Sequence, residues 1–371
     1  MYTSFSIVNF RCIRDLSIEK LAQINLIGGR NNVGKTALLE ALWMHSGPNM
    51  PELGDRLSRF RGVVNPDPKR LLADIFYDFD EARTISLSAG GDWDKKRRRT
   101  LEVTSEPVDP TPTPTPTPKE TSLPPRGSQE PDVAAVSTSK IVFKYTDEAD
   151  RRYQSSGYWA RGNITAPVQG EAQGFVSKVA KMPQRPGAVF LSARRHSAAE
   201  EDVRRFGEME MEGHAESIRE CLKTIDERIK GLTSLTIQTP MLYANVGLSR
   251  LVPIGFLGDG IGRYLSMSLA FYEARKGMLL IDEVENGLHH SALKGVWKNL
   301  YMLSQKFDVQ VFATTHSREC LVAARDAFVG DEKTKNAVLY HRLERRDNQV
   351  AAATYPFDDL DFTLDYGSEV R

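Results

Sequence analysis

The stretch from Gly28 to Thr36 constrains this chain more than any other part of its sequence. Gly29 and the run 34–36 match the pattern G-x-x-x-x-G-K-[ST], between an apolar run at 24–27 and a helical pattern at 37–44. In such a strand, turn and helix, backbone N–H groups and the helix N-terminus surround anionic phosphates. Lys35 would reach the β- and γ-phosphates, and the Thr36 hydroxyl would bind Mg²⁺. The sequence therefore predicts a nucleotide site at the start of this helix.

The residues of this loop expected to contact the nucleotide are Gly29, Arg30, Asn31, Asn32, Val33, Gly34, Lys35, Thr36 and Ala37. The alternative is a glycine-rich turn that carries Lys and Thr by coincidence. The strand-like and helical patterns on either side argue against that alternative, because the motif requires both.

A second apolar run, at 278–281, ends in two carboxylates, Asp282 and Glu283. An acid at the carboxyl end of a parallel strand would lie beside the phosphate loop, because open α/β sheets bind ligands at that edge. Asp282 is expected to hold Mg²⁺ through water, and Glu283 to polarise the attacking water. A surface Asp-Glu pair is the alternative, and the apolar residues directly before the pair argue against it.

A third strand-like run, at 309–313, is followed by Thr314, Thr315, His316 and Ser317. A histidine at this position can donate a hydrogen bond to the γ-phosphate. A single histidine is ordinarily a structural residue, and only its place after a third strand of the same type favours a catalytic role for His316. His289 and His290 have no further ligands at metal spacing and are not expected to bind a metal.

Glycines also mark the start of a helical pattern at 264–274, in the stretch Gly258-Asp259-Gly260-Ile261-Gly262-Arg263. A glycine-rich helix start can bind an anion, so this stretch is a second candidate anion site. A plain turn is the alternative.

The composition is that of an ordinary globular chain of 371 residues, 40% hydrophobic and 26% charged. Lys plus Arg and Asp plus Glu each number 49, so the zero net charge gives no overall electrostatic case for a nucleic-acid partner. No apolar run approaches the roughly 20 residues of a membrane span, and the N-terminus lacks a leader pattern. We therefore expect a cytoplasmic protein without a membrane partner. Cys12, Cys221 and Cys320 have neither disulfide-framework nor zinc spacing and are expected to pack.

The remaining segments indicate one α/β domain over residues 1–371. Strand-like runs occur at 5–8, 16–18, 75–77, 85–87, 101–103, 141–145 and 188–191. Residues 107–139, rich in Thr and Pro, cannot bury enough apolar surface to offset their ordering entropy, so they predict a disordered insertion between neighbouring strands. Apolar residues at three- and four-residue steps predict one amphipathic helix from Glu216 to Leu235, within a helical insertion at 196–235.

The run Lys95–Arg99 is strongly basic and begins beside a strand-like segment. Contact with nucleic-acid phosphate is one interpretation. A solvated hairpin end is favoured instead, because the whole chain is neutral.

Taken together, four motifs resemble those of the ATP-binding-cassette-type ATPases of the OLD and RecF group, and they occur in the same order. They are Gly29–Thr36, Gly258–Arg263, Asp282-Glu283 with Glu285-Asn286-Gly287-Leu288-His289, and Thr314–Ser317. In that resemblance, the first is the Walker A motif, Asp282 and Glu283 form Walker B, and His316 is the switch histidine. Gly258, Asp259 and Gly260 stand at the signature motif, which closes over ATP bound to the opposite protomer.

The resemblance covers residues 1–80 and 188–345. It implies a P-loop NTPase that uses ATP and Mg²⁺, with an ATP-binding-cassette-like mixed sheet, antiparallel in its N-terminal portion and parallel in its core. Two features depart from the family pattern. No residue is assigned to the glutamine loop usual between Walker A and the signature. OLD nucleases also carry a C-terminal TOPRIM domain, yet only 55 residues (371 − 316) follow His316, too few for another nuclease domain.

Asp359-Leu360-Asp361 spells D-x-D, a weak pattern more typical of surface acids, and we expect no nuclease. The resemblance implies an ATPase that works as a homodimer, or a higher even oligomer, and regulates an effector protein or acts on DNA. Family members often serve DNA repair or anti-phage defence. The alternative is a scaffold or sensor that holds ATP with little turnover and assembles an effector. A monomeric kinase is disfavoured, because it would need neither His316 nor the signature stretch.

Overall fold

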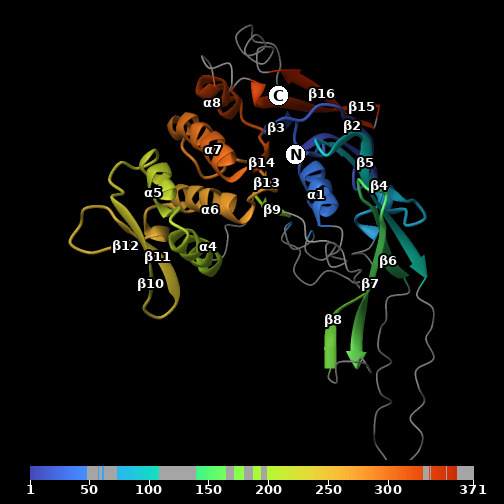
Figure 1. Ribbon diagram of the computed structural model, residues 1–371, viewed down its shortest axis with the longest axis horizontal. Helices are drawn as coiled ribbons and strands as arrows, with labels where there is room; N and C mark the ends of the chain where they lie inside the picture. Colours follow the sequence, from blue (N-terminus) through green and yellow to red (C-terminus); the bar gives the residue numbers. More distant parts are fainter. Residues whose placement is uncertain are drawn as a thin grey trace, which may run out of the picture.

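The computed structural model describes residues 1–47, 57, 61, 73–107, 139–163, 171–178, 187–193, 199–328, 334, 336–347 and 349–356. Figure 1 shows an antiparallel sheet on one side, a mostly parallel sheet in the middle, and a group of helices on the other side. This is a mixed α/β fold, as the sequence predicted.

The antiparallel sheet has seven strands in the order β2-β1-β4-β5-β6-β7-β8. Their bounds are β1 Tyr2–Phe10, β2 Ile13–Ile18, β4 Ile85–Gly91, β5 Asp94–Pro107, β6 Ser139–Thr146, β7 Arg152–Asn163 and β8 Glu171–Lys178. Side chains of β4 alternate between buried and half-buried, as expected for a sheet with one face on the core. Pro107 of β5 pairs with Ser139 of β6, which confirms that the Thr/Pro-rich segment joins neighbouring strands. Residues 108–138 themselves lie outside the described part.

The second sheet has six strands in the order β16-β15-β3-β14-β13-β9. Their bounds are β3 Ile24–Gly29, β9 Ala188–Leu191, β13 Met278–Ile281, β14 Gln310–Thr314, β15 Val338–Arg346 and β16 Gln349–Pro356. All neighbours are parallel except β15 and β16. Every residue of β3, β13 and β14 is buried, as in parallel strands covered on both faces. Because these strands are parallel, the residues after β3, β13 and β14 meet at one edge.

Helix α1 (Lys35–Ser46) lies between the two sheets (Figure 1). Residues 37–45 are all buried, and the apolar ones among them pack in one core with both β1 of the antiparallel sheet and β13 of the parallel sheet. The other face of the parallel sheet is covered by helices that form a second core with it. The helices of this second core are α4 Ala199–Met211, α5 Ala215–Lys223, α6 Asp259–Glu273, α7 Leu293–Phe307 and α8 Arg318–Phe328. Of these, α6 contacts β9 and β13, while α4 and α5 pack against α6.

Two local predictions are wrong. The run at 75–77 forms no strand: Phe76 makes a single bridge with Phe10, and the turn η1 (Tyr77–Phe79) follows. The expected helix from Glu216 to Leu235 ends at Lys223, and β10 (Gly231–Thr236) begins a three-stranded sheet with β11 (Pro240–Asn245) and β12 (Val252–Pro253). The segment at 196–235 is therefore not wholly helical. Two further short turns are η2 (Ile254–Phe256) and η3 (His290–Ala292).

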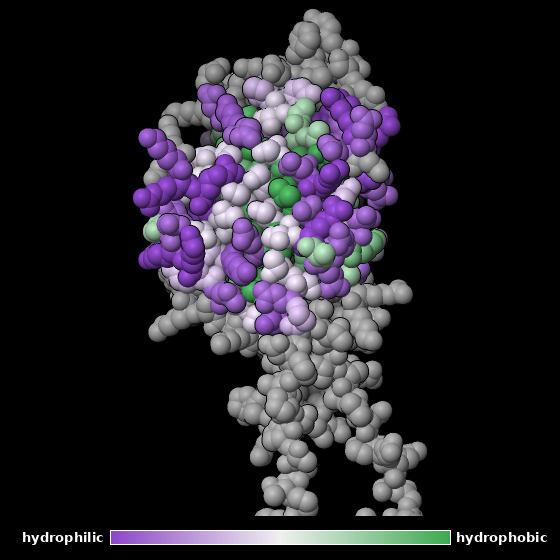
Figure 2. All heavy atoms as spheres, turned by 90° about the vertical axis from the view of Figure 1, so that its right-hand side faces the viewer, coloured by the Kyte–Doolittle hydropathy of each residue, from purple (hydrophilic) through white to green (hydrophobic). Residues whose placement is uncertain are grey.

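The basic run lies at the start of β5, directly after the β4–β5 turn. Arg97 and Arg99 bond to Glu148, and Arg98 donates to Ser88 on the outer face of the sheet. Figure 2 shows this side of the molecule, where hydrophilic side chains predominate and apolar ones are scattered. In the described part of the chain, no helix has the length and apolar character needed to cross a bilayer.

A buried histidine predicts a pH dependence of stability. His341 is 0% exposed, and its ring lies between Thr354 Oγ1 (3.0 Å from Nδ1) and Asn25 Oδ1 (3.2 Å from Nε2), partners that suit the neutral ring. Burial lowers the pKa of His341 to about 4. Below an unfolded pKa of about 6.5, the unfolded chain binds the proton more readily than the folded chain, so stability falls as pH drops from 6.5 towards 4.

We expect the free energy of unfolding to contain a contribution from His341 that falls by about 2 kcal/mol between pH 7.5 and 5. Urea unfolding of the wild type and of His341→Gln at both pH values checks this, because the difference between the two proteins isolates the histidine. An equal pH dependence in both proteins would contradict the prediction.

The pairing of Pro107 with Ser139 also predicts that a short Gly-Ser bridge can replace residues 109–138. Loop length has a small effect on closure entropy, so the melting temperature and ATPase rate should stay close to those of the wild type. Differential scanning fluorimetry and a phosphate-release assay measure both. Loss of folded protein would show that the segment is structural.

Candidate functional site

The phosphate loop, residues 29–36, runs from the end of β3 into α1. Gly29 and Gly34 have φ values of 134° and 112°, in the left-handed region that favours glycine. A side chain at Gly29 would also lie 2.3 Å from the carbonyl oxygen of Leu343. In the described part of the chain, no side chain caps the start of α1 and its first turn carries no acid. Its first N–H groups are therefore free of side-chain caps and suited to an anion.

Lys35 folds back over this loop. Its Nζ donates to the carbonyl oxygens of Gly29 (2.8 Å) and Arg30 (3.1 Å). Burial lowers the pKa of Lys35, while the carboxylates of Asp282 and Glu283 act in the opposite direction. The ammonium group thus lies between the loop and the acids that follow β13.

Asp282 joins three elements through its carboxylate. Thr36 Oγ1, on α1, donates to Oδ1 and Oδ2 at 3.2 and 3.0 Å, and Thr314 Oγ1, at the end of β14, donates to Oδ1 at 2.7 Å. The Glu283 N–H in turn donates to Thr314 Oγ1 at 2.8 Å. Thr314 therefore orients both acids.

Glu283 and His316 form the more exposed side of the site, next to the largely buried Glu285. His316 Nδ1 lies 3.8 Å from Glu283 Oε1 and 3.4 Å from Glu285 Oε1, and the His316 N–H donates to Glu285 Oε1 at 3.0 Å. The side chains of Glu283 and His316 are 38% and 48% exposed, so both can reach a bound molecule. Glu285 is only 11% exposed and holds the loop that carries His316.

The first turn of α6 packs against the loop that follows β13. A Cβ on Gly260 would lie 2.4 Å from the carbonyl oxygen of Gly287, so only glycine fits there. Gly258 and Asp259 are exposed and line a cavity of about 250 Å³, different from the cavity that Asn31 and Asn32 line. Within one chain, the structure thus brings the signature stretch to the Glu283–Gly287 loop.

A cavity of about 470 Å³ lies along the phosphate loop. It is lined by Arg30, Asn31, Asn32, Val33, Arg342, Leu343, Glu344 and Arg345. The residues from β15 were not predicted, although the basic segment Arg342-Leu343-Glu344-Arg345-Arg346 was a readable signal. The cavity is large enough for part of a nucleotide.

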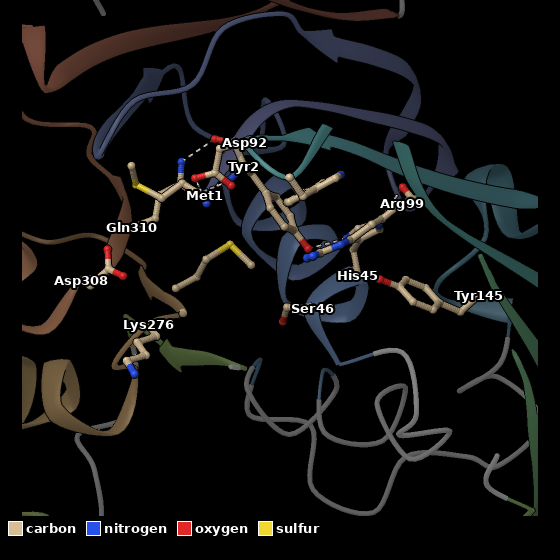
Figure 3. Close-up of a pocket in the computed structure, with 13 residues that line it drawn as sticks. Met1, Tyr2, His45, Ser46, Asp92, Arg99, Tyr145, Lys276, Asp308 and Gln310 are labelled. Carbon is tan, nitrogen blue, oxygen red and sulfur yellow. Dashed lines mark hydrogen bonds and ion pairs between the residues drawn. The ribbon is translucent and has the colours of Figure 1, made fainter. Parts of the chain in front are cut away.

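Another cavity, of about 290 Å³, lies at the opposite edge of the parallel sheet, where β13 and β14 begin (Figure 3). The Tyr2 hydroxyl lies 2.6 Å from His45 Nδ1, and Gln310 bonds the backbone of Tyr2. Residues that line this cavity are therefore hydrogen-bonded to one another. Because β13 has four residues, this cavity is about 13 Å of strand away from Asp282.

The oxygens at the site fit Mg²⁺. Thr36 and Asp282 present a hydroxyl and a carboxylate 3.0 Å apart, and Mg²⁺ takes oxygen ligands with one or two carboxylates plus substrate phosphates. Among the described residues, no group of three or more His, Cys, Asp or Glu side chains could form an all-protein metal cage. A cation shared with the substrate suits this donor set better than a structural metal.

The structure gathers Lys35, Thr36, Asp282, Glu283 and His316 at one sheet edge, and their roles stay predictions. Sequence reasoning gave no role to Thr314 or Glu285, although both stand inside the motifs that it quoted. It also gave no role to the side chain of Arg263, which donates hydrogen bonds to the backbone of Ser192, Asp282 and Glu283. Asp359 and Asp361 lie outside the described residues.

The chain matches one family model and is similar to several known proteins. The family model described as "AAA domain, putative AbiEii toxin, Type IV TA system" matches residues 24–321. A Helicobacter pylori protein named "ATP/GTP phosphatase" is 24% identical over 382 residues, covering 98% of this chain and 97% of that protein. The crystal structure of an SmcHead bound to the C-winged helix domain of ScpA aligns with a TM-score of 0.49 at 11% identity, covering 97% of this chain and 99% of that one. The SMC head domain from Thermotoga maritima aligns with a TM-score of 0.41 at 11% identity, covering 95% and 98%.

The position of Lys35 predicts a loss of nucleotide affinity in Lys35→Ala. Charge-assisted hydrogen bonds contribute about 1.5–3 kcal/mol, so the dissociation constant for ATP should rise roughly 10- to 100-fold. Titration with a fluorescent ATP analogue measures it. Lys276→Ala is the matched control, because Lys276 lines the cavity at the opposite edge. Equal affinity in both variants would remove Lys35 from the site.

Proposed function

Since the chain belongs to the AAA-domain family whose model spans residues 24–321, it is a P-loop ATPase, and we propose that it works as an ATP-switched dimer of the OLD and RecF-like group. The observation that carries this proposal is the convergence of Thr36, Asp282 and Thr314 in one hydrogen-bonded set beside Glu283 and His316. The name of the Helicobacter pylori relative, "ATP/GTP phosphatase", supports hydrolysis of a nucleoside triphosphate.

In this proposal the phosphate loop binds ATP through its N–H groups and Lys35. The Glu283 carboxylate accepts a proton from a water molecule as the water oxygen attacks the γ-phosphorus and the bond to ADP breaks. His316 donates a hydrogen bond to the γ-phosphate oxygens, where negative charge accumulates. Thr314 holds the Asp282 carboxylate and the Glu283 N–H in place. Bound to Thr36 and Asp282, Mg²⁺ would neutralise phosphate charge.

These groups contact the nucleotide from one side. The exposed Gly258 and Asp259, with Gly260, stand at a helix start, and we place this start of α6 over the ATP of a second copy of the chain. In a two-fold dimer each nucleotide would then contact both chains, so ATP would stabilise the closed state and hydrolysis would reopen it. The switch would act on an effector protein or on DNA.

Glu283→Gln tests the switch. The amide keeps the size of the side chain but cannot accept the proton, so hydrolysis should fall at least about 100-fold while ATP still binds. Light scattering should then show an ATP-dependent dimer or larger even assembly, because the closed state is no longer emptied by turnover. Adding Asp259→Arg should prevent this gain in mass.

Glu208→Gln is the control, since Glu208 pairs with Arg204 on α4. Normal turnover by Glu283→Gln would refute the base assignment. A mass that does not change with ATP would refute nucleotide-driven dimerisation. Tight ATP binding by the wild type without steady-state turnover would instead favour the low-turnover scaffold.

A further inference from the structure

Arg263 connects the start of α6 to the backbone of the two Walker B acids. Its Nη1 donates to Ser192 O (3.1 Å), and its Nη2 donates to Asp282 O (2.8 Å) and Glu283 O (3.1 Å). Ser192 follows β9, and the two acids follow the neighbouring β13. One side chain therefore binds the ends of two adjacent strands.

Arg263 is 4% exposed, so its charge is held inside the protein. Burial lowers its pKa, and the carboxylates of Asp282, Glu283 and Glu285 act in the opposite direction. A planar guanidinium donates from separate nitrogens in a fixed fork, which lets it bind carbonyl oxygens on two strands, whereas a lysine ammonium donates from a single nitrogen. The geometry thus uses a property that is specific to arginine.

The backbone that Arg263 holds is in a rare conformation. Glu283 has φ = 51°, in the left-handed region that non-glycine residues seldom adopt. Such a conformation persists only where surrounding contacts hold it, and it sets the direction in which the side chain leaves the backbone. The Glu283 N–H donates to Thr314 Oγ1, and the Glu283 carbonyl oxygen accepts hydrogen bonds from Arg263 and from the Asn286 N–H (3.0 Å).

The start of α6 touches the same loop a second time, through the close approach of Gly260 to Gly287. A displacement of the first turn of α6 would therefore reach the Glu283 backbone through two contacts within one chain. Interiors packed this closely transmit such shifts.

We propose that Arg263 is a positioning residue, which holds Glu283 in its hydrolytic conformation and couples it to the first turn of α6. This inference rests on the proposed function, in which that turn contacts the ATP of the second copy. Contact between the start of α6 and one nucleotide would then position Glu283, the base that acts on the other nucleotide.

The test compares Arg263→Lys with Arg275→Lys. Arg275 follows the opposite end of α6 and also donates to a backbone carbonyl, that of Tyr272, so it controls for the loss of an arginine. Arg263→Lys should lower kcat about 10- to 100-fold, because small displacements of a catalytic group have effects of this size. KM, ATP affinity and the melting temperature should stay close to the wild-type values. Arg275→Lys should leave all four unchanged.

A double variant shows whether Arg263 acts through Glu283. In the Glu283→Gln background, Arg263→Lys should cause no further loss of the residual hydrolysis, whereas an independent role predicts multiplied losses. Should Arg263→Lys fail to fold, Gly287→Ala disturbs the same loop, because Gly287 has φ = 76°. It should lower kcat in the same way with ATP affinity retained.

A wild-type kcat in Arg263→Lys, parallel losses of kcat, affinity and melting temperature, or multiplied losses in the double variant would each overturn the role of Arg263. For Gly287→Ala, an unchanged kcat would do the same. Normal turnover by Glu283→Gln would overturn the proposed function as well. The two failures are distinguishable, since an inactive Glu283→Gln beside a fully active Arg263→Lys contradicts only the positioning role.

Discussion

Burial of α1 between the two sheets determines where the phosphate loop points. The helix is buried from Ala37 to His45, and its apolar side chains belong to the core that both sheets share. An amphipathic helix can rock on one contact face, but a helix buried on all sides cannot tilt without opening a close-packed core. The N–H groups after Gly34 therefore stay directed at the edge where β13 and β14 end. Packing of α1 therefore holds the start of the helix in place beside the site.

The Asp282 carboxylate is the point at which that rigid helix meets the sheet. It accepts hydrogen bonds from Thr36 on α1 and from Thr314 on β14, while Thr314 also accepts the Glu283 N–H. A cation between Thr36 and Asp282 would require the Thr36 hydroxyl to turn its proton away and offer a lone pair. The bond from Thr314 need not change in that exchange. One threonine thus adapts to the ligand, and the other maintains the geometry of the acids.

The sequence correctly predicted those elements whose structure is determined by their local residue pattern. Continuous apolar runs such as 278–281 predict buried parallel strands, because such strands are covered on both faces. The polar residues that follow parallel strands then lie at the same edge of the sheet. The prediction of a helix up to Leu235 was wrong. Ile229 and Leu232 keep a helical spacing, but the chain turns at Asp226, whose carboxylate accepts a hydrogen bond from the Arg228 N–H. Both side chains reach the same core from a turn and a strand. The bonds of Arg263 to distant carbonyls could not be predicted, because backbone oxygens leave no trace in a sequence.

Asp259 places a negative charge at the start of α6, which is unusual for an anion site. An acid in the first turn stabilises the helix through its dipole, yet the same charge opposes a phosphate at that end. Any attraction must therefore come from the N–H groups of the following residues, offset in part by the carboxylate. A closed dimer held by this attraction, and opposed by the charge of the carboxylate, would open easily once the γ-phosphate leaves. Weak closure of this kind suits a nucleotide-driven switch better than a permanent assembly, because a small change in charge can then decide between the two states.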